Sequence, residues 1–344
     1  MTTVVALVAV FGILVSVHEL GHFLVAKALG MRVNEFSLGF GPALVSPQWG
    51  ETHYSVRIIP LGGYVRLAGM EMDKTSDPNE FPNRPLWQRF VVILAGPIMN
   101  LVLAGVLYTL AFGPVGIPTP TTTVAHTVPH YPAYTAGIRA GDRIVAVDKT
   151  PVANWTQLET AIVRHAHKPL LITLKRGHES KTVIVHTRYD KTLKQYIVGI
   201  QPTTYIVHLG FSASLRAGVG YTVQLTGLWF AAMFRLLEGK GPFDLTGPVG
   251  IAVMVSQAAQ SGMTYVILLA AALSTNLGLF NVLPIPVLDG SRLFLLGLEG
   301  IRRKAMDPDR ENMIHMVGFV VLILFVLVVT YHDIVHFFHV GAAF

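Results

Sequence analysis

Four long hydrophobic runs alternate with polar stretches along this chain of 344 residues. The runs cover residues 3–29, 90–112, 263–288 and 315–331. Each approaches the ~20 apolar residues that a helix needs to cross the hydrocarbon core of a bilayer. A further stretch, 211–238, mixes apolar residues with arginine and glutamine, which is compatible either with a span or with a helix lying along the membrane. The pattern predicts a polytopic α-helical membrane protein with about four spans.

The region 31–70 breaks this helical pattern. Its segments 33–40 and 52–67 alternate in polarity and are rich in valine, isoleucine, tyrosine and phenylalanine, with glycines between them as turn signals. We therefore predict hydrophobic β-hairpins at or in the membrane interface, and we call residues 31–70 the β-loop. A small sheet packed on itself is the alternative.

Residues 115–205 are polar, β-rich and free of long apolar runs. They predict one aqueous domain inserted between two halves of a membrane core, 1–113 and 206–344. Basic residues collect in 31–89 and 291–314. Because cytoplasmic loops of membrane proteins carry an excess of lysine and arginine, these two regions are expected to face the cytoplasm and the inserted domain the opposite side.

The composition supports a membrane protein. Hydrophobic residues make up 52% of the chain and charged residues 13%, and the mean hydropathy is +0.52. The net charge of +6 comes from basic residues beside the hydrophobic runs, so we expect no nucleic-acid partner. Cysteine is absent from the sequence, which excludes disulfides and thiolate ligands or nucleophiles.

The first hydrophobic run contains the sequence His18-Glu19-Leu20-Gly21-His22. On a helix, residues four apart project from nearly the same side, so His18 and His22 can share one metal ion. Glu19 lies about 100° away, where it can act as a general base on a water at the metal. A pair of histidines satisfied by neighbouring groups is the alternative. Ionisable residues within a span are costly and usually functional, which favours the metal site.

A catalytic zinc ion takes three protein ligands and one open position. Asp289 is the predicted third ligand, because Pro284 and Pro286 interrupt the hydrophobic run just before it. The alternative for Asp289 is an N-cap of the following helix. In the second run, Pro97 frees a backbone carbonyl and Asn100 adds a side-chain amide. The alternatives are a purely structural kink and a direct catalytic role for Asn100.

Several motifs in this order resemble the bacterial site-2 protease family of the RseP type over nearly the whole chain. They are His18-Glu19-Leu20-Gly21-His22-Phe23, Phe40-Gly41-Pro42, Pro60-Leu61-Gly62-Gly63-Tyr64-Val65, Ala95-Gly96-Pro97-Ile98-Met99-Asn100 and Asn281-Val282-Leu283-Pro284-Ile285-Pro286-Val287-Leu288-Asp289-Gly290. The resemblance implies a Zn²⁺-dependent protease of the bacterial inner membrane. It also implies that the β-loop is re-entrant and that 115–205 is a PDZ-like domain.

The resemblance further implies substrates that are single-span membrane proteins, such as a trimmed anti-sigma factor or a signal-peptide remnant. A helix in lipid must unwind locally before it can be hydrolysed, since its carbonyls are engaged in hydrogen bonds. The edge of the β-loop, at Gly62, Gly63 and Tyr64, is expected to pair with the unwound strand, and Asn276 or Asn281 to bond its backbone. The inserted domain could bind a peptide or substrate ectodomain, or it could filter untrimmed substrates.

Two departures from the family pattern stand out. The chain has room for one PDZ-like domain where many relatives carry two, and Ser291-Arg292 replaces the usual Gly-His after Asp289-Gly290. A zinc-binding transporter and an inactive membrane adaptor are the alternative functional classes. A transporter is disfavoured because no inverted repeat is visible, and an inactive adaptor is disfavoured because Glu19 is intact. Neither the natural substrate nor the oligomeric state follows from the sequence.

Overall fold

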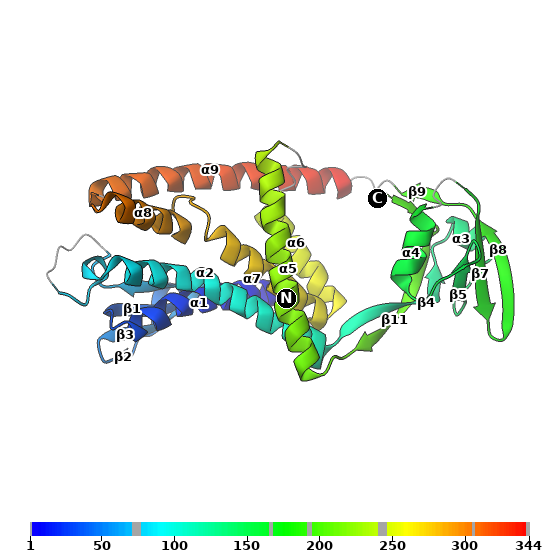
Figure 1. The fold of residues 1–344 in the computed structure, drawn as a ribbon, viewed down its shortest axis with the longest axis horizontal. Helices are drawn as coiled ribbons and strands as arrows, with labels where there is room; N and C mark the ends of the chain where they lie inside the picture. Colours follow the sequence, from blue (N-terminus) through cyan, green and yellow to red (C-terminus); the bar gives the residue numbers. More distant parts are fainter. Residues whose placement is uncertain are drawn as a thin grey trace. The chain divides into compact units, whose positions relative to one another are not determined.

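The computed structural model describes residues 2–70, 77–164, 168–190, 195–239, 246–304 and 307–341. The chain divides into two compact units (Figure 1). The helical unit consists of Met1–Val115 and Leu209–Phe344, and the β-domain consists of Gly116–His208.

The helical unit contains seven α-helices among its described residues. They are α1 (Thr2–Ala28), α2 (Leu86–Leu110), α5 (Phe211–Leu237), α6 (Pro248–Ser261), α7 (Met263–Phe280), α8 (Asp289–Arg302) and α9 (Pro308–Gly341). Short helical turns lie at Phe81–Asn83 (η1) and Ala111–Val115 (η2). Four described segments are long and apolar enough to cross a membrane, namely Thr3–Ala28, Leu86–Val115, Met263–Phe280 and Met313–Val335. The predicted polytopic membrane fold is confirmed.

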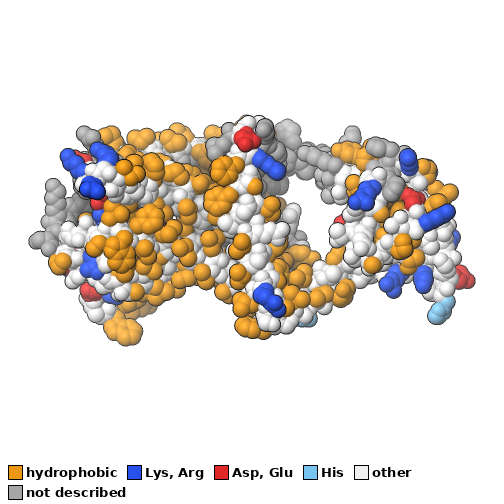
Figure 2. Space-filling view, in the orientation of Figure 1, with side chains coloured by type: hydrophobic (Ala, Val, Ile, Leu, Met, Phe, Trp, Pro, Cys, Tyr) orange, Lys and Arg blue, Asp and Glu red, His pale blue; other side chains and the backbone are white. Residues whose placement is uncertain are grey.

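One helix differs from the sequence-based expectation, and a second was left open by it. The third span ends at Phe280 rather than near residue 288, because turns begin at Asn281 and the prolines that follow cannot continue the helix. Helix α5 is continuous but is not among the four candidate membrane helices. Its mixed polarity was compatible either with a span or with a helix lying along the membrane. In Figure 2, many hydrophobic side chains lie on the visible surface of the helical unit, among scattered basic groups.

Helix α2 packs against both α1 and α7. Small residues allow the close approach: a Cβ added at Gly21 of α1 would lie 2.5 Å from the Ala95 carbonyl oxygen of α2. A Cβ added at Gly278 of α7 would lie 2.8 Å from the Pro97 carbonyl oxygen. Helices in membranes commonly associate through such small residues, since backbone proximity replaces the missing hydrophobic driving force.

The last helix, α9, is anchored by a buried carboxylate. Asp333, 5% exposed, accepts hydrogen bonds from the backbone N–H groups of Gly247 and Gly250 at 3.2 and 2.8 Å. These groups lie at the start of α6, where backbone donors have no partner within the helix. By contrast, the most apolar stretch of α9 has no buried residue, as expected of a surface that contacts lipid.

The β-loop is a three-stranded sheet built from β1 (Val33–Val45), β2 (Gln48–Trp49) and β3 (Thr52–Leu67). Strand β3 bends so that β1 lies between its two halves: Ser37 of β1 faces both Ser55 and Tyr64. Residues 62–67, which we call the edge segment, therefore pair with β1 on one side only. Gly62 has a φ of 110°, which side chains rarely tolerate and which permits this bend.

A charged cluster stabilises the interior of the β-loop. Glu35 accepts hydrogen bonds from Arg57 at 2.6 Å and Ser55 at 2.7 Å. Burial raises the pKa of the Glu35 carboxyl, but these hydrogen bonds outweigh it and hold that pKa below its usual value. Thus the hydrophobic hairpins enclose an ion pair that satisfies the charges they bury.

The β-domain is a curved sheet with two helices. Its strands are β4 (Ile117–Thr127), β5 (Arg143–Val147), β6 (Thr150–Pro151), β7 (Leu170–Arg176), β8 (Glu179–Val185), β9 (Arg188–Asp190), β10 (Gln195–Ile197) and β11 (Ile200–Val207), and its helices are α3 (Pro132–Thr135) and α4 (Trp155–Arg164). The main sheet has the order β11-β4-β5-β7-β8, with β6 beside β5. Ile144, Leu158, Leu170, Ile172 and Leu174 form its fully buried core.

Candidate metal centre

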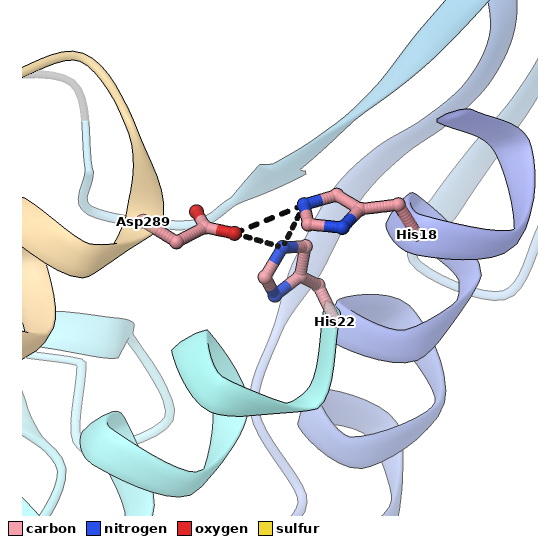
Figure 3. A group of neighbouring side chains, drawn as sticks. All are labelled: His18, His22 and Asp289. Carbon is pink, nitrogen blue, oxygen red and sulfur yellow. Dashed lines mark hydrogen bonds and ion pairs between the residues drawn. The ribbon is translucent and has the colours of Figure 1, made fainter. Parts of the chain in front are cut away.

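Helix α1 places two histidines on one face, one turn apart. His18 and His22 are 6% and 7% exposed, and their Nε2 atoms lie 3.2 Å from each other. Asp289, the first residue of α8, points at both rings (Figure 3). Its Oδ2 lies 2.9 Å from His18 Nε2 and 3.2 Å from His22 Nε2. Residues 271 positions apart in the sequence thus meet at one point inside the helical unit, as predicted from the sequence.

The three atoms fit a zinc ion. Tetrahedral zinc with bonds of about 2.0–2.1 Å separates its ligand atoms by about 3.3 Å, close to the three observed distances. Asp289 Oδ2 is buried and makes no well-formed hydrogen bond within the described residues, although two imidazole nitrogens approach it. An ionised carboxylate and two imidazoles are a ligand set typical of catalytic zinc.

The orientation of His22 is fixed by the main chain of α2. His22 Nδ1 lies 2.8 Å from the carbonyl oxygen of Val92. A carbonyl only accepts hydrogen bonds, so Nδ1 carries the ring proton and Nε2 is left with the lone pair that a metal needs. Pro97 in the next turn of α2 lacks an N–H and leaves the Ile93 carbonyl without its helical donor. The carbonyl next to Val92 thus loses its usual helical donor, and the Val92 carbonyl itself contacts His22.

Gly96 provides the space beside the two rings. A Cβ at this position would lie 2.6 Å from His22 Cε1 and 2.8 Å from His18 Cε1, and closer still to His22 Nε2. No side chain larger than hydrogen fits there without displacing the imidazoles. The sequence offered only a weak signal for this residue, a glycine inside a hydrophobic helix.

Glu19 contacts the β-loop. Its Oε2 accepts a hydrogen bond of 3.0 Å from the backbone N–H of Val65, in the edge segment. Since Val65 faces Phe36 of β1 on its other side, this N–H points outward from the sheet. The carboxylate therefore lies between the histidines and the unpaired edge of the β-loop, where it can exchange a proton with a reacting group. A backbone donor such as Val65 leaves no signal in the sequence.

The backbone on both sides of Asp289 is constrained. The N-cap of α8 is Leu288 rather than Asp289, so the alternative role of Asp289 as N-cap is not observed. Gly290 packs directly on the carbonyl oxygens of Leu283 and Val282, where a side chain would clash. Val287 has a φ of 80°, a strained value for a β-branched residue, immediately before this turn.

The residues that replace the family's usual Gly-His have visible contacts. Ser291 Oγ donates to the Leu288 carbonyl oxygen at 2.8 Å, and an Arg292 N–H lies 3.5 Å from Met70 Sδ. Farther along α8, Glu299 forms a two-point ion pair with Arg89 of α2, with N–O distances of 2.5 and 3.1 Å. This pair ties the helix that begins with Asp289 to the helix that orients His22.

The predicted substrate-binding residues occupy different environments. Asn276 is exposed on α7, whereas Asn281 is 8% exposed at the end of that helix. Gly62 and Gly63 are buried within the β-loop. The Tyr64 ring stacks on Phe40 at 6.3 Å between centroids, so it belongs to the packing of the β-loop. Their role toward a substrate stays a prediction.

The fold and the site together define a membrane metallopeptidase: four candidate membrane helices, two buried histidines that meet a partly buried aspartate, and a carboxylate one residue from the first histidine. The chain belongs to peptidase family M50, whose model matches residues 6–325. It is accordingly a zinc metalloprotease of the site-2 type, in agreement with the resemblance seen in the sequence.

Relatives match along almost their whole length. The zinc metalloprotease RasP of Geobacillus kaustophilus is 30% identical over 415 residues, covering 98% of each chain. The regulator of sigma-W protease RasP of Bacillus subtilis is 28% identical over 417 residues, covering 98% of this chain and 99% of its own. A protein of Clostridium acetobutylicum is 35% identical over 334 residues, covering 97% of each chain.

Among solved structures, the PDZ domain of an SdrC-like protein from Listeria monocytogenes is similar to part of this chain. The two are 18% identical, and the match covers 25% of this chain and 90% of the other, with a TM-score of 0.22. A protein of Geobacillus thermodenitrificans matches 24% of this chain and 95% of its own at 23% identity and a TM-score of 0.21.

Proposed function

We propose that this protease hydrolyses a peptide bond within the transmembrane segment of single-span membrane proteins. The observation that carries the proposal is the position of the metal cluster. His18 and His22 belong to a helix that is apolar along its length, and Asp289 follows the third candidate span. A peptide bond can reach these side chains only from within or beside the hydrophobic layer.

The residues have distinct roles in this reaction. His18, His22 and Asp289 would hold the zinc ion, which lowers the pKa of water and polarises the peptide carbonyl when bound. Glu19 takes a proton from the attacking water and returns it to the leaving amine as the carbon–nitrogen bond breaks. The Val65 N–H holds one oxygen of Glu19, which leaves the other free to face the water.

The edge segment of the β-loop is the proposed docking site for the unwound substrate. An extended peptide can add to an unpaired strand edge through main-chain hydrogen bonds. Residues 62–67 have such an edge, and it lies beside Glu19. Asn276 and Asn281, on the helix that leads toward Asp289, would bond the substrate backbone farther along.

The favoured substrates are anti-sigma factors already trimmed outside the membrane, with signal-peptide remnants as a second class. The Bacillus subtilis relative is named as a regulator of sigma-W, which favours the first class. We also propose that the chain resides in a bacterial cytoplasmic membrane with the metal centre toward the cytoplasm and the PDZ-like domain, about residues 115–205, on the outer side. The clustering of basic residues in 31–89 and 291–314 supports this orientation.

The test compares Glu19→Gln with the wild type on a trimmed single-span substrate in detergent. The variant should keep its zinc, because all proposed ligands remain, and should lose cleavage by at least about 100-fold, the lower end of what a general base contributes. Glu51→Gln is the matched control, since Glu51 is a half-exposed carboxylate that pairs with Lys27 in the described part of the chain. It should cleave normally.

Mass spectrometry of the products locates the cut. A cut outside the hydrophobic segment of the substrate would refute intramembrane proteolysis. Full activity of Glu19→Gln would refute the role assigned to Glu19.

A further inference from the structure

Asn100 of α2 lies against the far side of His18. Its side-chain amide is 3.0 Å from His18 Nδ1, the ring nitrogen that points away from Asp289. Asn100 is fully buried, so water does not compete for this contact. The residue is an amide within a membrane helix, where a polar group is retained only if it finds a partner.

The partner atom follows from the chemistry of a histidine ligand. If His18 binds a metal through Nε2, the single proton of its neutral ring must sit on Nδ1, as it does in His22. That proton needs an acceptor. The amide oxygen of Asn100 is an acceptor, whereas its NH₂ group is a donor and would direct the ring proton to Nε2, where the metal binds.

Among the described residues, no hydrogen bond to the amide oxygen holds the amide in the opposite orientation. With NH₂ facing His18, Asn100 Oδ1 is buried and without a hydrogen-bond partner among the residues that the structure describes. A rotation of the amide by 180° exchanges its oxygen and nitrogen at almost no steric cost. The main chain of Asn100 stays in place during this rotation, because its carbonyl oxygen accepts a 2.7 Å hydrogen bond from Ser274 Oγ of α7.

We propose that Asn100 is a positioning residue for the metal centre: its amide oxygen accepts the Nδ1–H of His18 and fixes the ring with Nε2 toward zinc. The inference rests on the proposed ligation by His18. Together with the Val92 carbonyl, it makes α2 the element that orients both histidines, one through its main chain and one through a side chain. These two acceptors are eight residues apart, about two helical turns, whereas the histidines are one turn apart.

The experiment measures zinc affinity of the purified full-length protein by competition with a chelator, and the visible absorption of the Co²⁺-loaded protein. Asn100→Leu keeps the approximate size and removes the acceptor. It should weaken zinc binding 10- to 100-fold, the usual effect of losing such a partner, and alter the Co²⁺ spectrum. Asn100→Asp retains an acceptor for Nδ1–H, so it should bind zinc within a few-fold of the wild type.

Ser274→Ala is the matched control for packing. It removes a buried hydrogen bond between α2 and α7 at the same residue but leaves the contact with His18 intact. It should bind zinc normally with an unchanged Co²⁺ spectrum. If Ser274→Ala loses as much affinity as Asn100→Leu, the amide acts through helix packing and the inference is wrong.

Two results separate this inference from the proposed function. Unchanged affinity and spectrum in Asn100→Leu, beside a loss of zinc in His18→Ala, would overturn the positioning role alone. Retention of zinc by His18→Ala would overturn the ligand assignment itself. Should Asn100→Leu fail to fold, Asn100→Asp decides the matter: weak zinc binding by that folded variant would also refute the inference.

Discussion

A methyl group added at Gly96 should abolish the metal centre while leaving most of the fold intact. The added Cβ would lie 2.6 Å from His22 Cε1 and 2.8 Å from His18 Cε1, whereas ordinary contacts begin near 3.4 Å. Relief of this overlap requires the rings to move by roughly 1 Å, but a metal site tolerates ligand displacements of only about 0.2–0.5 Å. We therefore expect Gly96→Ala to weaken zinc binding at least 100-fold, equivalent to about 2.8 kcal/mol.

The same substitution should affect the stability of the fold less than it affects zinc binding. Overpacking by one methyl group destabilises by about 1–3 kcal/mol, which a protein of this size can absorb. Gly105→Ala is the matched control on the same helix, because its added Cβ would meet Thr222 Oγ1 at 3.8 Å and Val219 Cγ2 at 3.9 Å, both ordinary contacts.

Zinc content by mass spectrometry, chelator competition and thermal unfolding of both variants form the assay. Gly105→Ala should match the wild type in all three. Wild-type zinc affinity in a folded Gly96→Ala variant would show that the rings have more freedom than the structure allows, and the reasoning from contact distances would fail.

Two further predictions concern orientation and the β-domain. In intact cells, a membrane-impermeant thiol reagent should label Ser180→Cys in the β-domain and spare Arg302→Cys at the end of α8; the reverse pattern would invert the proposed topology. The hydrogen bonds from Arg176 hold the pKa of the fully buried Asp142 below its usual value, so this stabilisation is present above about pH 4 and is lost as the pH falls through the folded-state pKa. The hydrogen-exchange protection factors of β5 and β7 should therefore fall below pH 4, and Asp142→Asn should cost about 1–3 kcal/mol at pH 7 and flatten this pH dependence; identical protection in wild type and variant would disprove the role of the ion pair.

The sequence was sufficient for the parts of the site that depend on side-chain identity and helical spacing. His18 and His22 are four residues apart in an apolar run, and Asp289 follows two helix-breaking prolines, so each leaves a pattern that can be read directly. The structure brings these three together as expected. Membrane spans were equally accessible, because hydrophobic length is a property of local sequence.

Backbone partners could not be predicted in the same way. Every residue has a backbone carbonyl, and every residue except proline has a backbone N–H, so only the fold reveals that the Val92 carbonyl faces His22 and the Val65 N–H faces Glu19. The path of β3 on both sides of β1 was also beyond the sequence pattern, which indicated hairpins but not the bend at Gly62. The length of the third span was overestimated because apolar residues continue past the turn at Asn281.

The double pairing of β1 has a consequence for where a substrate would be cut. The edge segment cannot slide along β1 without also breaking the pairs that β1 makes with the first half of β3, and Glu19 holds the same segment at Val65. A substrate strand docked on this edge would thus be held in a fixed register, and that register would end at Glu19. A shift by one residue moves the peptide bond by about 3.3 Å and turns the opposite side chains inward, far outside reacting distance. The cleavage site would then be chosen by its distance from the point where the substrate helix unwinds, more than by the identity of the residues beside it.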